Sequence, residues 1–144
     1  MKNTSKGFTI IELLVVVAII AVLTGIVLVN VTSYINKGKD AAIKGNLSTI
    51  LTNSAVYFDL PAGTFTDFCT NQYFTGPQAA ITSAGGTAIC QVNTNVPVGI
   101  AVCACSTLKV TPGNTFCVDS TGYKKETAAA CATRCPAATG ACID

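Results

Sequence analysis

Residues 6–29 read KGFTIIELLVVVAIIAVLTGIVLV, and this stretch decides how the rest of the chain is interpreted. The run 8–29 contains a single charged residue, Glu12, among side chains that are almost all apolar. As an α-helix it would be about 33 Å long, enough to cross the hydrocarbon core of a bilayer. Lys2 and Lys6 precede it and favour a cytoplasmic N-terminus. We therefore expect one membrane-spanning helix, whose single charge requires an explanation.

Three local interpretations of this segment compete. A secretory signal peptide is disfavoured, because the apolar run exceeds the usual length of about 7–15 residues and no Ala-x-Ala cleavage site follows it. A plain membrane anchor explains the length but leaves Glu12 without a partner or a function. The sequence TIIE at residues 9–12 also fits a capping box, in which the Glu12 side chain binds back to the start of the helix. The capping box stays open as a local role.

The arrangement of Gly7, Phe8 and Glu12 resembles the N-terminal processing segment of type IV pilins and pseudopilins. In that family a short basic leader ends in glycine, an aromatic residue follows, and a glutamate comes four positions later inside a long apolar helix. The resemblance implies that residues 1–7 are a leader, which a prepilin peptidase removes by cutting between Gly7 and Phe8. It also implies that the same enzyme N-methylates the new amino terminus at Phe8.

The resemblance also gives Glu12 a role in filament assembly. Cleavage after Gly7 would create a cationic amine at Phe8, about 6 Å along the helix from Glu12. When apolar helices bundle, they take this carboxylate out of water, which is unfavourable without a compensating charge. We expect the Phe8 amine of a neighbouring subunit to supply that charge. Such a pair would set an axial stagger of about four residues between subunits and act through specificity more than net stability.

A second helical segment follows the apolar run. Residues 30–60 are amphipathic, and Pro61 and Gly63 follow where a helix would end. Lys37, Lys39, Asp40 and Lys44 lie mostly off its apolar stripe. The stripe consists of Val31, Ile35, Ala42, Ile43, Leu47, Ile50, Leu51, Ser54 and Phe58.

These patterns predict four segments. They are a leader at residues 1–7, a transmembrane and filament-core helix at 8–29, an amphipathic helix at 30–60 that packs on the head, and a cysteine-rich β head at 61–144. The two helical segments are expected to form one helix that ends near residue 59.

All eight cysteines lie in the head: Cys69, Cys90, Cys103, Cys105, Cys117, Cys131, Cys135 and Cys142. This density predicts a disulfide scaffold, and disulfides persist outside the reducing cytosol. A zinc site is the alternative, but the chain has no histidine and no CxxC pair. On a strand Cys103 and Cys105 would face the same side, so we expect them to take different partners. The remaining connectivity stays open.

The head reads as a small antiparallel sheet. Short β-type runs at residues 87–92, 98–104, 107–110, 115–119 and 123–126 are separated by turn sequences. We expect a meander of three or four strands that rests on the amphipathic stripe. The C-terminal tail has no clear periodicity, and its cysteines would hold it in place. The predicted class is α+β: a long N-terminal helix packed on a disulfide-stapled sheet, as in pilins.

Enzyme chemistry finds little support in the sequence. There is no histidine, no carboxylate pair and no phosphate-binding glycine loop, so we expect no enzyme, no metal and no cofactor. Lys124, Lys125 and Arg134 could form a small basic patch for nucleic acid, although a solvated strand face explains them as well. The sequons at Asn30 and Asn46 lie on the predicted helix and read as chance matches.

The expected function is that of a structural subunit. By resemblance, the chain would be a single-pass inner-membrane precursor with its head outside, processed by prepilin peptidase and polymerised by the pilus assembly machinery into an extracellular helical homopolymer. The alternatives are a pseudopilin of a type II secretion or competence system, and an anchored extracytoplasmic binding module. The sequence leaves open whether a filament would serve adhesion, motility, DNA uptake or secretion.

Overall fold

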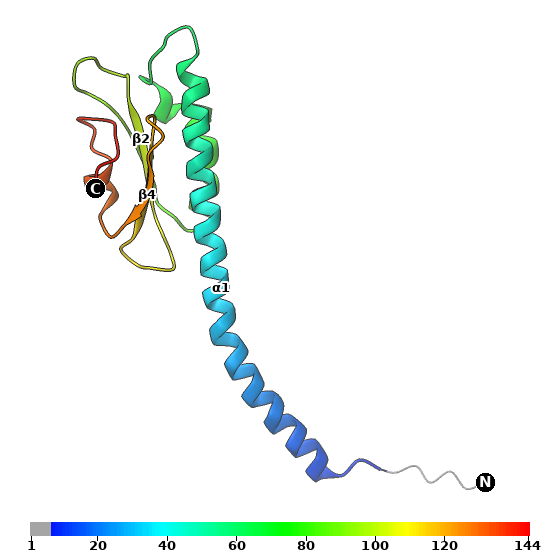
Figure 1. The fold of residues 1–144 in the computed structure, drawn as a ribbon. Coiled ribbons are helices and arrows are strands. Elements are labelled where there is room, and N and C mark those ends of the chain that lie inside the picture. Colours follow the sequence, from blue (N-terminus) through cyan, green and yellow to red (C-terminus); the bar gives the residue numbers. More distant parts are fainter. Residues whose placement is uncertain (1–6) are drawn as a thin grey trace. The chain divides into compact units, whose positions relative to one another are not determined.

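The computed structural model describes residues 7–144, apart from the side chains of residues 28–30. The chain divides into two compact units, Met1–Ile35 and Asn36–Asp144. All of the predicted leader except Gly7 lies outside the described residues. Figure 1 follows the elements along the chain. Their order is α1 (Ile10–Phe58), the 3₁₀-helix η1 (Phe68–Thr70), α2 (Gln72–Ser83), β1 (Ala88–Val92), β2 (Val102–Thr107), β3 (Thr115–Asp119), β4 (Lys124–Thr127) and α3 (Cys131–Arg134).

The N-terminal helix agrees with the sequence prediction within two residues at each end. α1 begins after Thr9 and ends ahead of Pro61 and Gly63, the residues predicted to stop it. Gly63 has a φ of 56°, in the left-handed region that glycine adopts readily. By length and composition α1 could cross a membrane. Its described side chains in the first unit are all exposed, so that unit has no core of its own.

The head contains the predicted antiparallel meander, with four strands in the order β1-β2-β3-β4. Two of the expected β runs were wrong in part. Residues 98–101 form a loop ahead of β2, because the Asn93 side chain donates to the Pro97 carbonyl at 2.6 Å and accepts from the Ala101 amide at 2.9 Å. Residues 108–110 also form a loop, since the buried Asp40 carboxylate accepts from two of its amides.

α2 was not predicted, because Gly76 and Pro77 lie in its sequence and both disfavour a helix interior. The Asn71 side chain caps its first turn by accepting from the Tyr73 amide at 3.3 Å. Pro77 has no N–H to donate to the Tyr73 carbonyl four residues earlier. The Asn53 side chain of α1 donates to that carbonyl instead, at 2.7 Å. A tertiary contact therefore replaces the hydrogen bond that the proline removes.

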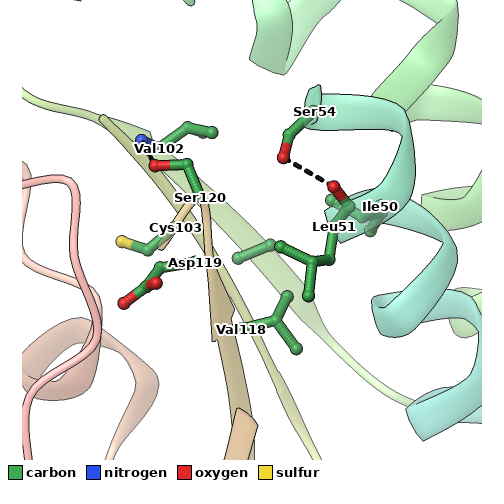
Figure 2. A pocket seen from close by; sticks show the side chains of 9 residues that line it. Ile50, Leu51, Ser54, Val102, Cys103, Val118, Asp119 and Ser120 are labelled. Carbon is green, nitrogen blue, oxygen red and sulfur yellow. Dashed lines mark hydrogen bonds between the residues drawn. The ribbon is translucent and has the colours of Figure 1, made fainter. Parts of the chain in front are cut away.

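The main core of the second unit lies between the sheet and the helices α1 and α2. Ile43, Leu47 and Ile50 of α1 are almost fully buried and belong to one apolar cluster. The other buried members are Phe65, Phe68, Phe74, Ile81, Val102, Ala104, Leu108 and Val118. Figure 2 shows where Ile50 and Leu51 of α1 approach Val102 and Val118 of the strands. The gap that remains there is about 10 Å³, the size of one water molecule.

The predicted apolar stripe is correct only in its centre. Ile43, Leu47, Ile50 and Ser54 are buried, whereas Val31 and Ile35 in the first unit are 44% and 52% exposed. Ala42 and Phe58 are also exposed. The prediction for Asp40 was wrong in the opposite direction. It was expected to lie off the apolar stripe, but its side chain is buried. Its carboxylate is satisfied by backbone amides of the β2–β3 loop, a partner that helical periodicity does not reveal.

The second face of the sheet is covered by the C-terminal segment, and four disulfides complete the fold. They join Cys69 to Cys90, Cys103 to Cys135, Cys105 to Cys131 and Cys117 to Cys142. Alternation along β2 directs Cys103 and Cys105 to this face and Val102 and Ala104 to the helix face. The two cysteines of β2 therefore take different partners, as the strand spacing predicted. The α+β class with a disulfide-stapled head is confirmed.

Candidate functional site

The predicted processing residues lie at the start of the described chain, ahead of the first helical turn. Gly7 and Phe8 precede α1, which begins at Ile10. A Cβ atom built on Gly7 would meet no atom within 4 Å, and Phe8 is 75% exposed. The peptide bond between them is therefore outside the helix and open to a second protein.

Glu12 forms the capping box that the sequence allowed. Its carboxylate oxygen Oε2 accepts from the Thr9 amide and from the Thr9 hydroxyl, both at 2.9 Å. In return, the Glu12 amide donates to the Thr9 hydroxyl at 3.3 Å. These contacts satisfy amides that the first turn of a helix leaves without intrahelical partners. In the uncleaved chain Glu12 thus has a local role, and its carboxylate remains exposed to a further partner.

The helix surface that follows Glu12 is apolar on all sides. Among its described residues, Leu14, Val17 and Val22 are each more than half exposed although their side chains are strongly hydrophobic. The Thr24 hydroxyl donates to the Ile20 carbonyl at 2.7 Å, so this polar group is satisfied within the helix. A helix that is hydrophobic all round belongs in a membrane or in the core of an assembly. This surface therefore requires lipid or other helices around it.

The head offers no metal-binding cluster within the part of the chain that the structure describes. The described residues contain no cluster of three histidine, cysteine, aspartate or glutamate side chains that could hold a metal ion. All eight cysteines are in disulfides. Asp119, the most highly connected acid, holds the β3–β4 turn by accepting from the Thr121 and Tyr123 amides, and it also accepts from the Cys142 amide.

The weak prediction of a basic patch at Lys124, Lys125 and Arg134 is wrong for Arg134. This side chain is 1% exposed, and its guanidinium donates to the carbonyls of Lys125 at 2.9 Å and Ile143 at 3.2 Å. It also donates to the Tyr123 hydroxyl at 2.9 Å. Arg134 is therefore a structural residue. The sequence around Arg134 has no periodicity, so it did not indicate that this side chain would be buried.

The Tyr123 hydroxyl continues this network to the C-terminal residue. It donates to the Asp144 carboxylate, to which the Lys125 ammonium also donates at 2.9 Å. The hydrogen bond from Tyr123, followed by that from Lys125, lowers the pKa of Asp144. The same hydrogen bonds raise the pKa values of Tyr123 and Lys125. The network fastens the chain end to β4.

Comparison with known proteins agrees with this geometry. Residues 2–28 match the family model of the prokaryotic N-terminal methylation motif. The fimbrial protein Q of Moraxella bovis is 34% identical over 114 residues, which cover 78% of this chain and 71% of that protein.

The chain belongs to the type IV pilin family. This pilin combines a methylation motif, an apolar N-terminal helix and a small four-stranded head with four disulfides. As a member of a structural family, the pilin is not an enzyme. No solved structure matches the chain.

Proposed function

We propose that this pilin is the structural subunit of a type IV pilus-like filament. It is made as a single-pass precursor in the inner membrane with its head outside, and its leader is removed by prepilin peptidase between Gly7 and Phe8. The mature chain then polymerises through its N-terminal helix. The observation that carries this proposal is the position of Gly7, Phe8 and Glu12 at the start of a helix whose described side chains at residues 10–27 are all exposed and mostly apolar.

The local geometry supports cleavage at this bond. A peptidase must bind its substrate backbone outside regular secondary structure, and residues 7–9 are non-helical. Gly7 adds no side chain that would hinder the approach. After cleavage and N-methylation, Phe8 carries a cationic amine close to the Glu12 carboxylate. Thr9 becomes the second residue of the mature chain, directly beside that new charge.

The apolar surface supports polymerisation as the end state. In the bilayer lipid tails cover this surface, and in a filament the equivalent helices of other subunits would cover it. Glu12 is the one charge in that surface, so bundling buries it unless a cation is supplied. The methylated Phe8 amine of the next subunit supplies that cation. The pair favours one axial stagger over others and thereby aligns the subunits.

The relative favours a pilus over the short fibre of a secretion pseudopilin. It is named as a fimbrial protein, and a fimbria is a surface filament. The amphipathic part of α1 and the disulfide-linked head also suit exposure outside the cell, where disulfides persist. We therefore place the mature subunit in an extracellular filament whose partners are further copies of itself.

Blocking cleavage tests this proposal. We expect Gly7→Leu to leave the precursor in the membrane with its leader attached and to abolish surface filaments in electron microscopy of cells. Gly25→Leu is the matched control, because a Cβ at Gly25 also meets no atom within 4 Å. The control subunit should lose residues 1–7 and gain one methyl group, as measured by mass spectrometry. Filaments built from uncleaved Gly7→Leu subunits would overturn the proposal.

A further inference from the structure

The charged side chains of the head are unevenly distributed along it. Residues 45–108 contain no lysine or arginine, and Asp59 and Asp67 are their only charged residues. In contrast, Lys37, Lys39 and Lys44 lie within the first nine residues of the second unit. We call the region of Lys37, Lys39 and Lys44, which follows the apolar segment, the cationic end of the head. The long stretch after it contains no cationic side chain.

Lys109 joins this cationic end through a tertiary contact. The buried Asp40 carboxylate accepts from the Lys109 amide at 2.5 Å and from the Val110 amide at 2.9 Å. Because Asp40 follows Lys39 directly, the β2–β3 loop is held against the turn of α1 that carries Lys39. The side chains of Lys39 and Lys109 are exposed, as is that of Val110 at 44%.

A shallow hollow lies between this loop and α1. Its volume is about 330 Å³, and it is lined by Lys37, Asp40, Ala41, Lys44, Val110, Thr111 and Glu126. The Lys44 ammonium contacts the Glu126 carboxylate at 2.7 Å, and the Asp40 carboxylate is satisfied by the two loop amides. Of the two lysines that line this hollow, Lys37 is exposed and Lys44 is half-buried, and the apolar Val110 also lines it.

In the proposed precursor, the length of chain between the apolar helix and Lys39 keeps this lysine within reach of a membrane surface. The distance from Phe8 to Tyr34 along a helix is about 39 Å, close to the total thickness of a bilayer with its headgroups, about 40–45 Å. Tyr34 is 71% exposed, and tyrosine is enriched at membrane interfaces. Lys39 follows Tyr34 by five residues, at most about 18 Å of extended chain. This reach holds whatever the relative placement of the two units.

We propose that Lys39 and Lys109 bind anionic phospholipid headgroups of the outer leaflet while the precursor waits in the membrane. Each lysine near an anionic surface contributes favourably, and the flexible stems can reach the phosphates. Docking would hold the head against the membrane until the subunit is extracted. The proposal rests on the membrane-inserted precursor of the proposed function but does not require polymerisation.

A tryptophan reporter tests this docking. The chain contains no tryptophan, so Val110→Trp gives one fluorophore beside Lys109. The full chain is incorporated at one copy per lipid nanodisc, with pure phosphatidylcholine or with about one third phosphatidylglycerol, and a headgroup-attached spin label quenches nearby tryptophan. We expect stronger quenching in the anionic discs. The quenching should fall when salt is raised from about 0.1 M to about 1 M, which shortens the Debye length from about 10 Å to about 3 Å.

Variants in which uncharged glutamine replaces lysine identify the residues that bind the headgroups. In the reporter background, K39Q/K109Q should weaken the docking equilibrium by roughly 30-fold, since each lysine contributes near an anionic surface. K124Q/K125Q is the matched control, because it removes the same charge from exposed residues on β4 and should leave quenching unchanged. Incorporation into the discs is measured separately by size-exclusion chromatography, and a chain that fails to insert contradicts the proposed function as well.

Three results would overturn the lipid proposal while leaving the proposed function intact. The first is equal quenching in neutral and anionic discs. The second is equal loss in K39Q/K109Q and in K124Q/K125Q. The third is a change in tryptophan quenching that occurs only when a disc holds several chains. That result would indicate that the cationic end binds the acidic region around Asp59 and Asp67 of a second copy.

Discussion

At the scale of single residues, buried polar side chains determine how the loops of the head are held. Asp40, Asn93 and Asp119 each bind backbone groups of a loop that would otherwise lack regular partners. Arg134 does the same for the C-terminal tail, where its guanidinium donates to three carbonyls and to the Tyr123 hydroxyl. Removing such a side chain leaves buried groups unpaired, which is more damaging than the loss of one exposed contact.

Arg134→Leu tests this role for the C-terminal tail. We expect the free energy of unfolding to fall by roughly 2–4 kcal/mol, because the substitution removes the guanidinium and leaves its carbonyl partners without their donor. Near-ultraviolet circular dichroism of tyrosine during urea unfolding of the full chain in detergent would measure it. Lys124→Leu is the control on an exposed site. An equal, small change in both variants would contradict the structural role.

Glu126 gives the head a dependence on pH. Hydrogen bonds from Asn114 at 2.8 Å and from Lys44 at 2.7 Å lower the pKa of Glu126 below its ordinary value near 4.5. Because the folded pKa is depressed, its stabilising contribution is complete above the unfolded pKa and is lost as the pH falls through the folded pKa.

Glu126→Gln should therefore destabilise the head at neutral pH and have little effect in acid. The difference in unfolding free energy is expected to stay below about 1 kcal/mol, since the ion pair is partly exposed. Urea titrations at about pH 6 and about pH 3 would compare the two proteins. Asp67→Asn, an exposed acid elsewhere on the head, controls for net charge. A difference that does not shrink in acid would show that packing, and not the carboxylate charge, is responsible.

At the scale of secondary structure, α2 depends on α1. The Tyr73 carbonyl lacks its helical partner because Pro77 has no N–H, and Asn53 donates to it instead. We expect Asn53→Leu to lower the free energy of unfolding by about 1–2 kcal/mol, the usual effect of leaving a partly buried carbonyl unpaired.

A second variant, Pro77→Ala, tests this explanation, because alanine restores an N–H within α2 that can donate to the Tyr73 carbonyl. In that background Asn53→Leu should be much less harmful, so a double-mutant cycle would show positive coupling between the two positions. Urea unfolding of the four proteins provides the energies. Purely additive effects would mean that Asn53 stabilises the head through some other contact.

The elements differ in how well the sequence predicts them, and the reasons are physical. α1 was predicted because its apolar run and the stop at Pro61 and Gly63 are local signals. The four strands were predicted approximately, whereas α2 was missed because its local sequence argues against a helix. Its stability comes from Asn53 and from burial of Phe74 and Ile81, which depend on segments remote in sequence.

At the scale of the whole molecule, the disulfides and the N-terminal segment each have one feature that the local sequence predicts and another that depends on remote segments or on a second chain. The count and spacing of cysteines predicted a stapled head, but the partners of Cys103 and Cys105 depend on how the tail crosses the sheet. Gly7, Phe8 and Glu12 could be predicted from the sequence because they belong to one short local motif, and residues 2–28 match the family model of the prokaryotic N-terminal methylation motif. The proposed assembly role of Glu12 involves a second subunit, because its partner would be the Phe8 amine of a neighbouring chain.

Glu12 makes a capping contact within the chain, and its proposed role in assembly is a charge pair between chains. The contacts with Thr9 need only an acceptor oxygen, whereas the pair with a neighbouring Phe8 amine needs a negative charge. Glutamine keeps the oxygen and loses the charge, so Glu12→Gln separates the two.

The most direct measurement is electron microscopy of cells that express Glu12→Gln, combined with mass spectrometry of the subunit. If the charge pair aligns the subunits, the variant will be inserted, cleaved after Gly7 and methylated at Phe8, yet cells will lack filaments. If Glu12→Gln cells instead assemble filaments of normal length and number, the acceptor oxygen of the capping box is sufficient and the charge pair is not required for assembly.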